Sequence, residues 1–123
     1  MVESVKDRRL KLRVVFDPIA MVGPGRVDLL EFIQETGSIS AAGRRMGMSY
    51  KRAWSLVEAM NAIFRAPLVE STRGGAKGGG AALTRDGETV LAAYRRIEIK
   101  LAEAAAPELG VLTAMLGDMS GGR

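Results

Sequence analysis

The sequence contains no cysteine and no histidine. Without cysteine there can be no disulfide bonds or thiolate metal sites, and without histidine the commonest general base and metal ligand are missing. No apolar run approaches the ~20 residues that a membrane-spanning helix needs, and residues 1–11 lack the apolar segment of a secretory signal. We therefore expect a cytoplasmic protein with no enzymatic activity, no cofactor and no membrane span.

The positive charge is unevenly distributed along the chain. The 123 residues are 47% hydrophobic and 26% charged, which fits one globular domain with a net charge of +4. Residues 38–80 carry seven basic and two acidic side chains, and residues 1–15 carry five basic and two acidic ones. Residues 16–37 and 81–123, by contrast, are net acidic. A basic middle block of this kind favours a negatively charged partner.

The first half of the chain shows one strand pattern and three helix patterns. Apolar and polar residues alternate over residues 10–16, which predicts a strand. Three helices are expected from apolar residues at helical spacing, and they span residues 26–36, 41–46 and 50–64. Gly37 is expected to end the first helix, Ser40 to cap the second and Ser49 to cap the third.

The second half predicts a hairpin followed by a long helix. Short strands at residues 68–71 and 81–83 flank a glycine-rich loop over residues 72–80. Thr84 is expected to cap a helix over residues 85–105, which Pro107 breaks before a short apolar segment at residues 109–116. The predicted divisions are a basic arm (1–9), the main domain (10–106) and a C-terminal short helix with a tail (107–123).

Residues 39–57 have the features of a helix-turn-helix unit. Two helices joined by a tight turn need small residues where they touch, and Ala42 and Gly43 supply them. Gly47 suits a turn position with positive φ. Four apolar side chains are expected to be buried beneath the unit: Met46, Met48, Ala53 and Leu56.

The start of the third helix is expected to meet DNA, because a recognition helix points its N-terminal residues at base edges in the major groove. At least one of Arg44 and Arg45 is expected to contact phosphate, and the sequence does not say which. In the glycine-rich loop, Arg73 and Lys77 would neutralise phosphate charge. The predicted DNA-binding residues are Arg44, Ser49, Tyr50, Lys51, Arg52, Ser55, Arg73 and Lys77.

Two features have other interpretations. Trp54 could stack on bases, but large aromatic residues usually serve burial, so we expect it to pack within the helix-turn-helix core. The glycine-rich loop lacks the Ser or Thr that follows Lys in a phosphate-binding P-loop, since Gly78 follows Lys77. It could also be a surface loop that makes no contact.

Several motifs resemble the N-terminal DNA-binding domain of ModE-type molybdenum-dependent regulators, over roughly residues 10–100. The motifs are GSISAAG at 37–43, GMSYKRAW at 47–54, MN at 60–61, GGAKGGG at 74–80 and LT at 83–84. The first is also similar to LysR-type regulators. The resemblance implies a homodimer, with the N-terminal strand and the long helix in the dimer, and a function in transcription regulation.

The expected fold class is α+β and mainly helical: a winged helix-turn-helix with an N-terminal strand, a Gly-rich wing and a long C-terminal dimerisation helix. The expected function is sequence-specific binding of double-stranded DNA by a homodimer. Full-length members of the family bind molybdate through C-terminal domains. The residues that follow the match are too few to form such domains, so no molybdate cofactor is expected. The alternatives are a protein-interaction module and an oxyanion-responsive regulator.

Overall fold

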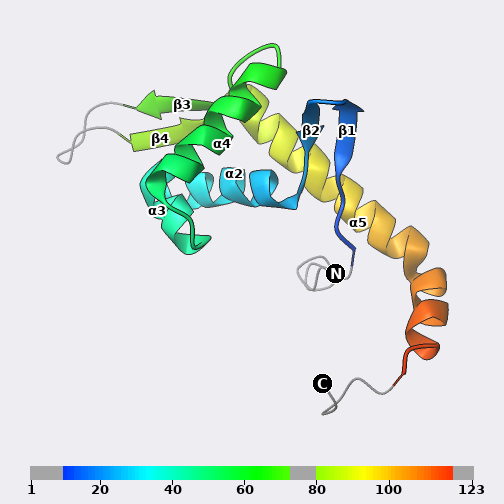
Figure 1. Ribbon diagram of the computed structural model, residues 1–123. Coiled ribbons are helices and arrows are strands. Elements are labelled where there is room, and N and C mark those ends of the chain that lie inside the picture. Colours follow the sequence, from blue (N-terminus) through cyan, green and yellow to red (C-terminus); the bar gives the residue numbers. More distant parts are fainter. Residues whose placement is uncertain (1–9, 73–79, 118–123) are drawn as a thin grey trace. The chain divides into compact units, whose positions relative to one another are not determined.

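The computed structural model describes residues 10–72 and 80–117 (Figure 1). The described residues divide into two compact units: the larger lies within residues 11–95, and the smaller contains residue 10 and residues 96–117. The elements of the described residues follow the order β1–β2–α2–α3–α4–β3–β4–α5, with two antiparallel strand pairs. This arrangement confirms the predicted α+β, mainly helical, winged helix-turn-helix class.

An N-terminal hairpin joins β1 (Val14–Asp17) to β2 (Ala20–Val22). Its turn is held by Asp17 Oδ1, which accepts hydrogen bonds from the backbone N–H groups of Ile19 and Ala20 at 3.0 and 2.9 Å. The alternation over residues 10–16 predicts a strand that starts four residues before β1, and it does not predict β2. A three-residue strand is too short to show a period of two.

Helix α2 (Pro24–Thr36) begins at Pro24, two residues before the predicted start at Arg26. Proline is tolerated there because the N–H groups of the first helical turn have no partner within the helix. The helix ends where predicted, at Gly37, whose φ of 73° lies in the left-handed region. The Gly37 N–H donates to the carbonyl of Ile33 at 2.8 Å and closes the last turn.

Helix α3 (Ile39–Arg45) is capped by Ser38, so the prediction of Ser40 as the cap is wrong. The Ser38 hydroxyl oxygen accepts from the backbone N–H of Ala41 at 3.0 Å. Because α2 ends at Gly37, Ser38 already has extended backbone and is the first residue able to cap. Ser40 lies inside the helix, where its hydroxyl oxygen accepts from Arg44 Nη1 at 2.9 Å.

Helix α4 (Tyr50–Ile63) is capped by Ser49, as predicted, through a 3.1 Å hydrogen bond from the Arg52 N–H. Near its C-terminal end, Asn61 Oδ1 accepts from the backbone N–H groups of Leu68 and Val69 at 2.8 and 3.2 Å. Asn61 Nδ2 also donates to the Val69 carbonyl at 3.2 Å. A single amide side chain therefore ties the start of the next strand to α4.

Strands β3 (Val69–Thr72) and β4 (Gly80–Leu83) pair from Val69↔Leu83 to Thr72↔Gly80. They form the base of the predicted wing, and the loop between them, which carries Arg73 and Lys77, lies outside the described residues. The Ala81 N–H donates to the Gly37 carbonyl at 2.9 Å. This bond fixes the base of the hairpin to the turn between α2 and α3.

Helix α5 (Arg85–Ala114) continues through Pro107, so the expected break at this proline is wrong. A proline removes one backbone hydrogen bond, but the alanines before it and the leucine and glutamate after it favour helix. The predicted cap at Thr84 is confirmed, because its Oγ1 accepts from the Gly87 N–H at 3.0 Å and donates to the Pro67 carbonyl at 2.7 Å.

The core of the larger unit is built from α2, α4, the hairpin strands and the first turns of α5. Arg95 on α5 reaches α2, with Nη2 2.8 Å from Asp28 Oδ1 and 2.7 Å from Glu31 Oε1. The Tyr94 hydroxyl donates to the Leu12 carbonyl and so ties the segment before β1 to α5. The largest fully buried side chains are Leu29, Leu30, Ile33, Met60, Leu68, Val27 and Val57.

Gly87 lies where α5 passes the backbone before β3, and a Cβ there would be 2.1 Å from the Leu68 carbonyl oxygen. We expect Gly87→Ala to lower the free energy of unfolding by about 2 kcal/mol, as overpacked sites do, measured by urea denaturation. Gly25→Ala is the control, because no atom lies within 4 Å of its Cβ position, and its effect should stay within about 0.5 kcal/mol. Equal losses in the two variants would contradict the close approach.

Candidate nucleic-acid interface

The contact between α3 and α4 depends on a residue without a side chain. A Cβ on Gly43 would lie 2.9 Å from the Cβ of Ala53, closer than real Cβ atoms approach. The Gly43 carbonyl accepts from the N–H groups of both Met46 and Met48 at 3.0 Å, which closes the turn. Gly47 has a φ of 72°, so the predicted need for small residues and for a positive-φ glycine is confirmed.

The inner face of α4 packs on the core. Ala53, Val57 and Met60 are buried, as their helical spacing predicts. Leu56 is partly buried against the same core, together with Met46 and Met48 from the turn. The burial of this face fixes which side chains of α4 point outward.

The outer face at the start of α4 carries five of the predicted DNA-binding residues, and all five are exposed: Ser49, Tyr50, Lys51, Arg52 and Ser55. Within the described part of the chain, Lys51 and Arg52 form no ion pair. The Ser49 hydroxyl, by contrast, is occupied as the helix cap. The N-terminal end of α4 therefore carries two cations that pair with no carboxylate of the described residues.

The two arginines at the end of α3 differ in their surroundings. Arg45 Nη1 lies 2.6 Å from Glu35 Oε1, and its guanidinium carbon is 5.5 Å from the centre of the Phe32 ring. Arg44 is exposed and donates to the uncharged Ser40 hydroxyl. Arg45 is thus paired with a carboxylate at the surface, with its side chain still 51% exposed, whereas Arg44 pairs with no carboxylate among the described residues.

Trp54 is a surface residue, so its predicted place in the helix-turn-helix core is wrong. It is 36% exposed, and its ring stacks on that of Tyr50 with centroids 6.4 Å apart and planes 12° apart. The core position at this point of α4 belongs to Ala53, and the next residue is rotated by about 100° around the helix axis. The contact between the rings could have been predicted from the sequence, because residues four apart, such as Tyr50 and Trp54, are neighbours on a helix surface.

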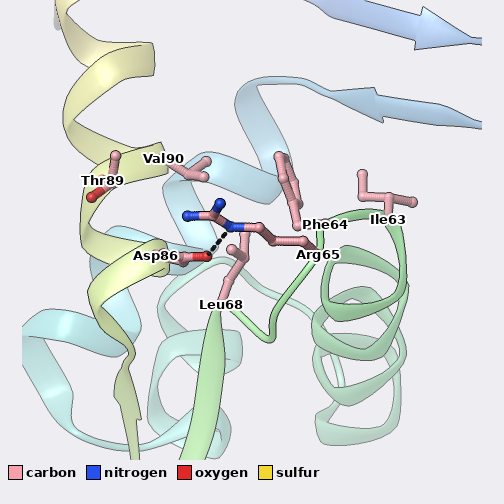
Figure 2. Close-up of a pocket in the computed structure, with 7 residues that line it drawn as sticks. All are labelled: Ile63, Phe64, Arg65, Leu68, Asp86, Thr89 and Val90. Carbon is pink, nitrogen blue, oxygen red and sulfur yellow. Dashed lines mark hydrogen bonds and ion pairs between the residues drawn. The ribbon is translucent and has the colours of Figure 1, made fainter.

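A pocket of about 380 Å³ lies between the end of α4 and the start of α5 (Figure 2). Arg65 Nε crosses it to Asp86 Oδ2 at 3.4 Å. The side chains that line it are Ile63, Phe64, Arg65, Leu68, Asp86, Thr89 and Val90. Its walls are mostly aliphatic and aromatic, and its polar groups are this ion pair and the Thr89 hydroxyl.

The residues that the structure describes lack two further features. They contain no group of three or more acidic, histidine or cysteine side chains placed to hold a metal ion. None of their helices combines the length and apolar character needed to cross a membrane.

Comparison with known proteins confirms the resemblance seen in the motifs. The chain is 52% identical over 84 residues to the molybdenum-pterin-binding protein MopB of Rhodobacter capsulatus, covering 68% of this chain and 31% of that protein. It is 40% identical over 94 residues to the transcriptional regulator ModE of Haemophilus influenzae, covering 76% and 37%. With the DNA-binding transcriptional dual regulator ModE of Escherichia coli K12, the identity is 44% over 71 residues, covering 58% and 27%.

The chain spans about a third of the length of these curated relatives. The shared part contains the helix-turn-helix, whose geometry is described above. Residues 26–88, just over half of the chain, match the family described as bacterial regulatory helix-turn-helix proteins of the lysR family, and the chain belongs to this family.

Proposed function

We propose that this chain is a DNA-binding transcriptional regulator that acts as a homodimer on duplex DNA in the cytoplasm, without enzymatic activity. The observation that carries the proposal is the exposed N-terminal end of α4, where Lys51 and Arg52 face solvent, together with the exposed Arg44 on the preceding helix α3. Arginine and lysine at this end of a recognition helix can donate to guanine O6 and N7 or to phosphate. The names of relatives that are described as transcriptional regulators support the same function.

The proposed mode of binding places α4 in the major groove, with the loop between β3 and β4 on the DNA backbone. Arg73 and Lys77 of that loop would neutralise phosphates. In a symmetric dimer the two α4 helices would enter successive major grooves about 34 Å apart and read a roughly palindromic site.

Exposed apolar side chains support the homodimer. In the smaller unit, the last turns of α5 and the residues after them expose Val111, Leu112, Met115 and Leu116, each more than half accessible in the single chain. In the larger unit, the N-terminal hairpin exposes Val15, Phe16 and Ile19. Groups of exposed large apolar side chains typically mark a protein interface.

The test of the proposal is fluorescence anisotropy with a random-sequence duplex and with a duplex selected from a DNA pool, across a salt series. We expect tight binding that weakens with salt and enrichment of a palindromic site, because each neutralised phosphate adds about −0.9 to the slope of log K against log salt. Absence of binding to any duplex at low salt would reject the DNA-binding function and favour a protein-interaction module.

Arg52→Ala should weaken binding to the selected duplex by about 5- to 150-fold, the cost of losing a base contact, and weaken random duplex less. Arg65→Ala is the control. It also removes one positive charge, but Arg65 follows the C-terminal end of α4, so the preference for the selected over the random duplex should stay unchanged. Equal losses of Arg52→Ala on both duplexes would reassign Arg52 to a phosphate.

Lys77→Ala should weaken binding to selected and random duplexes alike and reduce the salt slope by about one unit per wing contact. The measurement is the anisotropy salt series on each duplex. A salt slope identical to that of the unsubstituted protein would remove this loop from the interface.

A further inference from the structure

Two aromatic rings stand exposed on the outer face of α4. Tyr50 is 57% exposed and Trp54 36% exposed, although the rings stack almost parallel, with planes 12° apart. Neither side chain forms a hydrogen bond with a residue that the structure describes. The contact between the rings therefore leaves part of each aromatic surface in water, where apolar surface is unfavourable.

The surroundings of the rings indicate what covers them. Lys51, Arg52 and Ser55 belong to the same first turns of α4 as the rings and are all exposed, although Arg52 projects from a different side of the helix than Trp54. A partner that covers this end of α4 must bury aromatic surface and also accept hydrogen bonds from two cations. The major groove of DNA meets both demands, because it lies between phosphates and displays base acceptors beside one apolar group, the 5-methyl of thymine.

We propose that Trp54, with Tyr50 as its positioning residue, reads thymine methyl groups in the major groove; this inference rests on the proposed DNA-binding function. The polar side chains on this face can serve the donors and acceptors of the base edges, and the ring pair supplies the apolar surface that a methyl group requires. Trp54 lies one turn beyond the start of α4, in the part of a recognition helix that faces the bases.

The stacking explains why both rings are needed. A tryptophan alone on a helix surface has several rotamers, and fixing one of them on binding costs conformational entropy. Tyr50, four residues earlier, lies against the indole in the free protein. The indole is therefore already held in place before DNA arrives, which reduces this entropic cost.

The experiment compares the selected duplex with the same duplex in which deoxyuridine replaces thymidine. This replacement keeps every base-pairing group and removes only the 5-methyl. We expect about four-fold weaker binding for each methyl contacted, the factor that corresponds to burying one methyl-sized group. In Trp54→Ala the ratio of the two affinities should fall to one, whereas Glu58→Ala, at an exposed position of α4 outside the predicted DNA contacts, should keep the ratio of the unsubstituted protein.

A second measurement needs no substitution. Trp54 is the only tryptophan of the chain, so the indole emission reports this position alone. We expect the thymidine duplex to quench the emission or shift it to shorter wavelength as the ring loses water. Unchanged emission at saturating duplex would overturn the proposal even if Trp54→Ala does not fold.

The outcomes separate this inference from the function on which it rests. If the unsubstituted protein binds no duplex, both fail. If it binds tightly but with equal affinity for the thymidine and deoxyuridine duplexes, the regulator stands and the methyl reading is wrong. A Trp54→Ala protein that keeps the full preference for thymidine would likewise overturn it, because the preference would then come from DNA shape.

Discussion

The close approach of Gly43 to Ala53 is the contact on which the helix-turn-helix depends. With no Cβ on one side and a single methyl on the other, α3 can lie against α4 while the Gly43 carbonyl closes the turn. Any larger side chain at either position would have to separate the two helices. Because the inner face of α4 is then fixed on the core, the orientation of Lys51, Arg52 and Trp54 toward solvent follows from this contact.

Backbone hydrogen bonds connect the other elements to this unit. The Gly37 carbonyl, at the turn between α2 and α3, holds Ala81 of β4, while the Leu68 carbonyl accepts from Thr84 just before α5. Asn61 joins the end of α4 to the first residues of β3. The base of the hairpin is thus attached to both ends of the helix-turn-helix, which fixes the position of strands β3 and β4 relative to α4.

Charge pairing separates an arginine that stabilises the fold from those available to a partner. Arg95 is largely buried between Asp28 and Glu31, whereas Arg45 and Glu35 form a half-exposed surface pair that contributes little to stability. Arg44 and Arg52, by contrast, have no carboxylate partner among the described residues and lie on the same helix-turn-helix unit. Exposed arginines of this kind destabilise the fold little, because water solvates their charge. Their hydrogen bonds to phosphate would be strong, so we expect them to serve binding rather than stability.

Local sequence determined the elements whose signals are themselves local: Gly37 and Gly47 at positive φ, the caps at Ser49 and Thr84, and the helical spacing of α2 and α4. The resemblance of the motifs then identified the family. Tertiary structure decided the rest. Trp54 lies outside because Ala53 takes the core position, and Arg45 is paired with a carboxylate ten residues away. These outcomes depend on how the helices pack, which spacing along one helix does not encode.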